Sequence, residues 1–304
     1  MADEPRRRRP SERVWARLPA GVREVLVDQL SPTDLQSLLL DVARSRAQVV
    51  TPARLRDRWR NDRFVLPGPV DPRRLAETDA ALWRLLPEEF EGVTLSPVTP
   101  LGTCGAVAPV DQNRILSTVR STEVVSDATN VLALEAAARR RPGSNPVHLA
   151  ACHRVLRTQP FPPPALAHFE LFNLVSSARD RGSARTEAEL LTVHLRYWGR
   201  VIADRLGGSA RVALTVIDDE NLRGRVADTV RPALTGVTLV DAPHRTQGIG
   251  YYRSAAFKIM AGPDGDTEIG DGGFTDWTAS LLADAKERCL VSCISTERLT
   301  ALAG

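Results

Sequence analysis

Long hydrophobic runs are missing from this 304-residue chain, and none approaches the ~18 consecutive apolar residues that a membrane span needs. The N-terminus opens on charged residues and prolines and lacks the apolar stretch of a secretory signal. Cysteine is scarce, and 4 residues in a chain of this size do not make a disulfide framework. These absences argue against a membrane partner and predict a cytoplasmic protein.

Lysine is nearly absent, because Lys258 and Lys286 are the only two among 40 basic residues. The net charge of +3 is too close to neutral for a protein that coats nucleic acid with its whole surface. The charge is uneven, since residues 1–66 hold 14 arginines against 9 acidic residues. The hydrophobic content of 43% is ordinary for a globular protein of one large or two modest domains.

The N-terminal part predicts a disordered tail over 1–13 and a small helical module over 14–66. Ser31 is placed to cap a helix that Pro32 begins, and apolar residues then recur at helical spacing. Thr51 and Pro52 open a second helix in the same way. The module's arginines could face a phosphate backbone, but we favour a solvated helix surface. They are Arg54, Arg56, Arg58, Arg60 and Arg63.

Residues 67–304 predict one larger domain after a proline-rich connector over 66–72. An amphipathic helix is expected over 72–86 and a strand over 92–100. Further strands are expected over 121–126, 169–176, 211–218, 236–241, 252–260 and 289–295, and helices over 130–140, 187–206, 220–234 and 275–286. Loops too short for crossover helices favour an antiparallel sheet flanked by helices, hence an α+β fold. The proline-rich stretch 160–164 is expected at a hairpin tip.

Common catalytic motifs are missing as well. The sequence has no phosphate-binding P-loop, no dinucleotide fingerprint, no paired-histidine zinc motif and no nucleophile elbow. Cys289 and Cys293 lie four residues apart without a second pair, so we interpret them as buried apolar side chains and assign no metal ligand.

An ordered set of motifs is more informative. The segments are Cys152-His-Arg-Val-Leu-Arg157, His168-Phe-Glu-Leu-Phe-Asn173, Gln247-Gly-Ile-Gly-Tyr-Tyr252, Gly272-Gly-Phe-Thr-Asp276 and Ser295-Thr-Glu-Arg298. In this order they resemble the catalytic domain of class II aminoacyl-tRNA synthetases, in particular the histidyl-tRNA synthetase branch. That branch includes the regulatory subunit of ATP phosphoribosyltransferase. The resemblance spans about residues 72–304.

The resemblance implies a fold that joins a carboxylate to ATP as an adenylate, with Mg²⁺ and planar cations on the phosphates. It implies that Arg154 contacts the α-phosphate and the attacking carboxylate, and that Arg298 holds the γ-phosphate. Arg157 and Glu297 are expected beside them at the ATP site. Asp127, Thr129, Glu170, Gln247, Tyr251 and Tyr252 are expected to shape the substrate pocket. Helix 72–86 is expected to form a homodimer.

Several positions depart from the family pattern. Leu156, Gln247, Gly250 and Phe274 stand where the family has charged residues, and Asp127 replaces a glutamate. Six residues follow Arg298, which leaves no room in this sequence for an anticodon-binding domain. Ordinary histidyl-tRNA formation is therefore not expected.

Three functions stay open. One is a ligase that activates a different carboxylate, and another is a non-catalytic paralogue that binds a small metabolite or a partner protein. In the third, residues 14–66 bind tRNA or DNA.

Overall fold

The structure is a computed structural model that describes residues 10–141, 143–162, 166–245, 250–262, 265 and 267–304. Its contacts divide the chain into two units, residues 1–59 with 118–121 and residues 60–117 with 122–304. Among the described residues, no helix combines the length and apolar character that a bilayer crossing requires.

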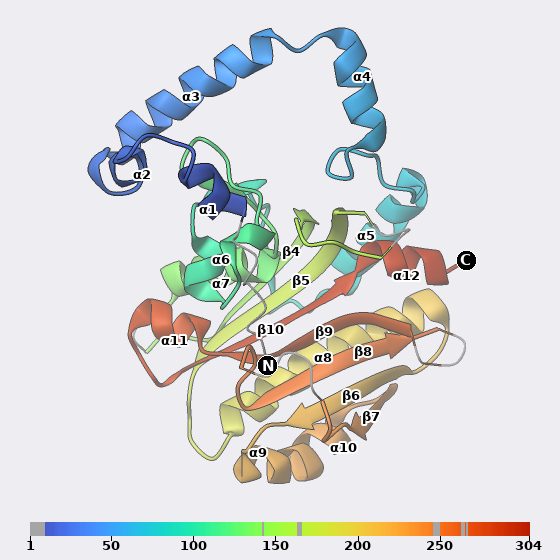
Figure 1. The fold of residues 1–304 in the computed structure, drawn as a ribbon. Coiled ribbons are helices and arrows are strands. Elements are labelled where there is room, and N and C mark those ends of the chain that lie inside the picture. The colour runs from blue at the N-terminus through green and yellow to red at the C-terminus, as the bar shows by residue number, and fades with distance from the viewer. Residues whose placement is uncertain (1–9, 142, 163–165, 246–249, 263–264, 266) are drawn as a thin grey trace, which may run out of the picture. The chain divides into compact units, whose positions relative to one another are not determined.

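The first unit is helical, as its capping residues predict (Figure 1). Its helices are α1 (Pro10–Trp15), α2 (Val22–Glu24) with a π-helical turn over Val25–Gln29, α3 (Pro32–Gln48) and α4 (Pro52–Asn61). The Ser31 side chain accepts a hydrogen bond from the Asp34 backbone N–H at 3.1 Å, which confirms the predicted cap of α3. Residues 10–13, expected in a disordered tail, are helical instead because Pro10 is suited to a first helical turn. None of these helices buries a residue.

The second unit is built on an eight-stranded sheet with the order β1-β4-β5-β10-β9-β8-β6-β7. The strands are β1 (Glu91–Gly92), β4 (Val147–Leu156), β5 (His168–Arg179), β6 (Ala210–Val216), β7 (Val237–Asp241), β8 (Ala255–Ala261), β9 (Thr267–Thr275) and β10 (Glu287–Ser295). All pairings from β4 through to β6 are antiparallel, which confirms the predicted α+β fold. The two edge strands pair in parallel. For β7 this follows from the helical segment 220–233, which carries the chain back.

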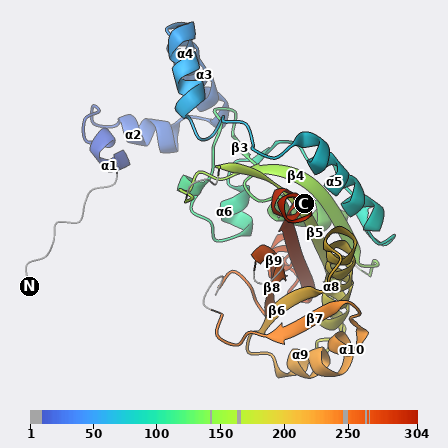
Figure 2. The ribbon, with the colours of Figure 1, turned by 90° about the vertical axis from the view of Figure 1, so that its right-hand side faces the viewer.

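Helices cover both faces of this sheet (Figure 2). On one face, α5 (Pro72–Leu85) and α8 (Arg185–Leu206) pack their apolar sides, including Leu82 and Trp198, against strand residues such as Phe172. On the other face lie α7 (Ala128–Arg139) and α11 (Trp277–Leu282), whose core includes Trp277 and Val291. The remaining elements are α6 (Thr103–Val107), a 3-10 turn (Gln112–Arg114), the pair β2 (Val98–Pro100) and β3 (Thr122–Val124), α9 (Glu220–Arg225), a π-helical turn (Val226–Val230), α10 (Arg231–Ala233) and α12 (Thr296–Leu302).

Two local predictions were wrong. No strand was expected over 267–275, yet these residues form β9, because Gly270 lets the strand lie against β10. A Cβ at Gly270 would come within 2.1 Å of the Cys293 carbonyl oxygen, so a side chain there would push the strands apart. The single strand expected over 92–100 is two short strands, β1 and β2, in different sheets.

Candidate functional site

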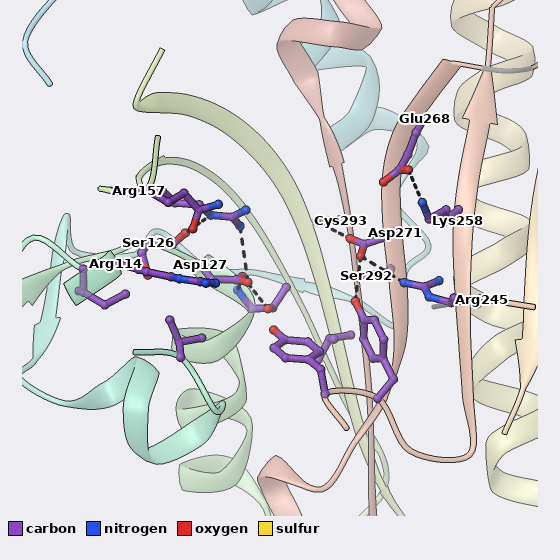
Figure 3. A pocket seen from close by; sticks show the side chains of 17 residues that line it. Arg114, Ser126, Asp127, Arg157, Arg245, Lys258, Glu268, Asp271, Ser292 and Cys293 are labelled. Atoms are coloured by element: carbon purple, nitrogen blue, oxygen red, sulfur yellow. Dashed lines mark hydrogen bonds and ion pairs between the residues drawn. The ribbon is translucent and has the colours of Figure 1, made fainter. Parts of the chain in front are cut away.

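A cavity of about 310 Å³ lies on the α7 side of the sheet. Its walls come from the N-terminus of α7, from β8, β9 and β10, and from the segment before β8 (Figure 3). Four cationic and three acidic side chains line it. These are Arg114, Arg157, Arg245 and Lys258, with Asp127, Glu268 and Asp271. A concave site with a few convergent polar groups is the usual form of a small-molecule site.

One wall carries Asp127, which caps the N-terminus of α7. One oxygen of its carboxylate, Oδ1, accepts hydrogen bonds from the Thr129 backbone N–H at 3.0 Å and from the Thr129 hydroxyl at 2.7 Å. The other oxygen, Oδ2, lies 3.7 Å from Arg157. Arg157 donates from Nε to the Ser126 carbonyl at 2.9 Å, and its guanidinium lies 5.2 Å from the centre of the Phe169 ring. The cap and the backbone bond therefore fix an acid and a guanidinium side by side.

The facing wall carries Asp271 on β9 (Figure 3). Its Oδ2 accepts a hydrogen bond from the Tyr252 hydroxyl at 3.1 Å and lies 3.8 Å from Arg245. Burial raises the pKa of Asp271, and the negative charge of Asp127 raises that pKa further. Beside this group, the Lys258 ammonium donates to Glu268 at 2.7 Å. This wall therefore presents two acidic and two cationic side chains to a ligand in the cavity.

Tyr251 also lines the cavity. Its ring packs edge to face on Tyr252 at 4.9 Å and on Trp277 at 5.4 Å, measured between ring centres. Burial raises the pKa of Tyr251 well above its usual value, and the charges of Asp127 and Asp271 add to this effect. The hydroxyl therefore stays protonated and can donate a hydrogen bond to a ligand.

Arg154 and Arg157 face opposite sides of β4 and its continuation, because an odd residue separation reverses the side-chain direction in a strand. Arg157 lines the cavity, whereas Arg154 lies outside it. Arg154 instead contacts Glu297 at 2.8 Å and His168 at 3.1 Å, with Glu170 at 3.9 Å. The position expected at the α-phosphate is thus part of an ionic network beside α12, and the guanidinium in the cavity belongs to Arg157.

Arg298 lies in the first turn of α12 and also outside the cavity lining. Its Nη1 donates at 2.9 Å to the carbonyl of Glu268, a residue that does line the cavity. Arg154 reaches Glu297, the residue next to Arg298, so the two arginines lie at the same end of β10 but do not meet in one cavity. Of the remaining expected residues, Gln247 lies outside the described part of the chain.

Glu170 belongs to a second group of polar side chains, on the α5 side of the sheet. It accepts from the Thr296 hydroxyl at 3.1 Å and lies close to Asp79 and Cys152. Burial and the charge of Glu170 raise the pKa of Asp79 to about 6. Burial also raises the pKa of the Cys152 thiol. Glu170 therefore does not shape the cavity, in contrast to Asp127, Thr129, Tyr251 and Tyr252, which all line it.

Five charged residues of the cavity were not identified from the sequence: Arg114, Arg245, Lys258, Glu268 and Asp271. Asp271 stands in the glycine-rich run 270–273, and Arg245 comes two residues before Gln247, where the family has its arginine. A search for a displaced charge near each altered position could have found these two. Arg114 and Lys258 carry no local signal, because folding alone brings them to the site.

Comparison with solved structures identifies the fold. Histidyl-tRNA synthetase from Nostoc has a TM-score of 0.60 at 13% identity, covering 83% of this chain and 74% of that one. An ATP phosphoribosyltransferase regulatory subunit/histidyl-tRNA synthetase from Bacillus halodurans has a TM-score of 0.57 at 12% identity, covering 79% and 82%. Histidyl-tRNA synthetase from S. aureus has a TM-score of 0.56 at 15% identity, covering 78% and 69%.

A scan against protein-family models finds no match, and neither does a search of the curated proteins. The structural matches show that the chain has the class II aminoacyl-tRNA synthetase fold, which confirms the resemblance at the level of fold. A fold supports several functions, so the activity has to be argued from the site.

Proposed function

We propose that the chain binds ATP at this cavity and activates a small carboxylic acid as its adenylate. In this reaction a carboxylate oxygen of the substrate attacks the α-phosphorus of ATP. A new P–O bond forms, and the bond to the departing pyrophosphate breaks. Negative charge grows on the phosphate oxygens during the step, so the site must present fixed cations. Four cationic side chains line the cavity and meet this need.

The observation that carries the proposal is the state of Arg157. Within the described residues its Nε makes the only hydrogen bond of the side chain, and Asp127 is 3.7 Å away, beyond hydrogen-bonding distance. The two Nη groups are held in place by the backbone bond and the Phe169 ring while their N–H donors remain available. A preorganised guanidinium with available donors suits bidentate binding of a phosphate or carboxylate. We therefore assign Arg157 to the α-phosphate and the attacking carboxylate.

Arg298 is assigned to the terminal phosphates, as the resemblance implies. Its side chain donates to the backbone carbonyl of Glu268, a residue of the cavity lining, so the guanidinium lies beside the cavity. Arg154 then acts as a positioning residue, since its ion pair at 2.8 Å holds Glu297, the neighbour of Arg298 on α12.

The donor set fits Mg²⁺ that arrives with the nucleotide. Among the described residues, the cavity has no three acidic, histidine or cysteine side chains close enough to share an ion, so the protein offers no cage of its own. Mg²⁺ commonly binds through substrate phosphates and waters with one or two carboxylates, and Glu268 is a carboxylate in the cavity lining whose backbone carbonyl accepts from Arg298. When bound, the ion would neutralise phosphate charge.

Titration calorimetry with ATP and Mg²⁺ tests the nucleotide site. We expect binding by the wild type and a loss of at least about tenfold in affinity for R157A, since a charged hydrogen-bonding group is removed. R179A is the matched control, because Arg179 pairs with Asp284 at 2.5 Å outside the cavity. No ATP binding by the wild type, or unchanged binding by R157A, would refute the proposed site.

Exchange of labelled pyrophosphate into ATP, across a panel of amino acids and other carboxylic acids, tests the chemistry. Exchange that depends on one added acid supports adenylate formation and identifies the acid. ATP binding without exchange for any acid would refute the ligase and leave a non-catalytic paralogue that binds a metabolite or a partner protein.

The homodimer through α5 is part of the same proposal. Trp83 lies in the last turn of α5 and is 37% accessible. Another side of this helix packs on α8 and α12. Light scattering should give twice the chain mass of 33.2 kDa. A monomer at micromolar concentration would contradict it.

A further inference from the structure

Asp271 has unused capacity to accept hydrogen bonds inside the cavity. An ionised carboxylate offers about four acceptor positions. Within the described residues, Oδ2 of Asp271 accepts from the Tyr252 hydroxyl, and Oδ1 lies 3.8 Å from the Cys293 thiol, a weak donor. The carboxylate therefore faces the cavity with acceptor positions that the protein leaves for a ligand.

The neighbouring cations do not remove this capacity. Arg245 is 3.8 Å from Asp271, beyond hydrogen-bonding distance, and its guanidinium lies 5.3 Å from the centre of the Tyr252 ring. The Arg245 side chain is 10% exposed and that of Asp271 is 39% exposed, so the carboxylate is the more accessible member of the pair. Lys258 is occupied, because its ammonium donates to Glu268.

Two further groups complete an environment for a cation. The Tyr251 hydroxyl makes no hydrogen bond in the described part of the chain, although Tyr251 lines the cavity together with both acids. Asp127 on the facing wall has an oxygen, Oδ2, that lies 3.7 Å from Arg157, beyond hydrogen-bonding distance. A positively charged nitrogen bound at Asp271 would share the cavity with the Asp127 carboxylate and the Tyr251 hydroxyl, both of which can attract it.

We propose that the substrate carries a second, basic nitrogen and that Asp271 binds this nitrogen as a primary ammonium. The chemical class is a diamino acid, with a carboxylate directed to Arg157 and a side-chain ammonium directed to Asp271. Asp271 thus determines specificity, selecting basic over neutral side chains of the same length. This inference rests on the proposed function only in taking the bound carboxylate to be the group that is activated.

Titration calorimetry with the full-length chain tests the selection of basic side chains by binding alone, without adenylate formation. The probes are L-lysine, L-ornithine and L-2,4-diaminobutyrate, with L-norleucine as a neutral side chain similar in length to that of lysine. We expect at least one diamino acid to bind about tenfold or more tightly than norleucine, as one charge-assisted hydrogen bond allows. D271N should reduce this preference to near equality, because the amide keeps the shape and loses the charge.

The matched control is D276N, since Asp276 is an acid outside the cavity that pairs with Arg253. It should keep the wild-type preference.

A second measurement needs no variant. Because burial raises the pKa of Asp271, affinity for the diamino acid should rise with pH as this carboxyl ionises, while norleucine binding should not. Norleucine binding as tightly as every diamino acid, or an unchanged preference in D271N, would overturn the inference.

The two proposals fail separately. A diamino acid that binds through Asp271 but supports no pyrophosphate exchange would refute the ligase and keep the specificity. Exchange with neutral amino acids alone would keep the ligase and refute the role of Asp271.

Discussion

Replacing Asp79 by asparagine should stabilise the protein at pH 8. Asp79 on α5 lies beside Glu170 on β5, and its Oδ1 faces the Cys152 thiol at 3.6 Å. Burial and the charge of Glu170 raise the pKa of Asp79 from 3.8 to about 6. At neutral pH two carboxylates therefore oppose each other between α5 and the sheet.

The sign follows from the raised pKa. The folded state holds the proton more tightly than the unfolded state, so the contribution to stability is complete below pH 3.8 and is lost as the pH rises through about 6. At about 1.36 kcal/mol per tenfold change in the acid constant, the full effect is about 3 kcal/mol. Solvent screening of the half-buried Asp79 side chain reduces this contribution to stability to about 1.5 kcal/mol. About 1 kcal/mol of this contribution is lost between pH 4.5 and pH 8.

The amide of D79N resembles the protonated acid, because it can donate to Glu170 and still accept from Cys152. Urea unfolding followed by tryptophan fluorescence should therefore show D79N gaining about 1 kcal/mol more over the wild type at pH 8 than at pH 4.5. D241N is the control, since the Asp241 side chain is 77% exposed and its substitution should behave alike at both values. An equal gain at the two pH values, or a larger one in acid, would refute the reasoning.

Three further predictions concern the rest of the chain. Arg140 and Glu287 form an ion pair at 2.7 Å, and their side chains are 3% and 6% exposed. R140M should therefore lower the free energy of unfolding, measured in urea, by about 3–5 kcal/mol, and R140M/E287L should recover part of this loss. Burial lowers the pKa of His194 well below 6.5, so H194F should flatten the loss of stability as the pH falls below 6.5, measured by thermal melts. At pH 8 the same substitution should cost about 2 kcal/mol, because Ser176 and Ser292 each lose one hydrogen bond. Removal of residues 1–59 should abolish any salt-dependent binding of tRNA in filter assays, and unchanged binding would exclude this segment as the contact.

Local rules of the chain predicted much of the fold. Ser31 caps its helix as expected, and the strands expected over 211–218 and 236–241 are β6 and β7, because alternation and capping depend on neighbours in sequence. The strand β9 could not be found in this way. Its glycines have low strand preference. Gly270 and Gly272 are nevertheless required there, because β10 packs against them too closely for a Cβ.

The site was harder to predict because a motif fixes residue order but not side-chain direction. Arg154 and Arg157 both fit an arginine next to a proline-rich hairpin. The register that pairs Arg154 with Glu170, together with the pleat, sends Arg154 to the α5 side and leaves Arg157 in the cavity. The prediction for Cys289 is confirmed, because this residue is buried among apolar side chains.

The charge of the site depends on which side chains reach the cavity and not on which charges stand in the sequence motifs. Phe274, at a position where the family has an arginine, belongs to the core on the α8 side, so a charge at this position would not face the cavity. Arg245 and Lys258, which match no motif, do face it. The cavity therefore keeps four cations against three acids, with Arg157, Arg245 and Lys258 each beside an acid. Arg114 is the cation in excess, which favours a ligand with both signs of charge and a small surplus of negative charge, as a diamino acid and ATP with Mg²⁺ together provide.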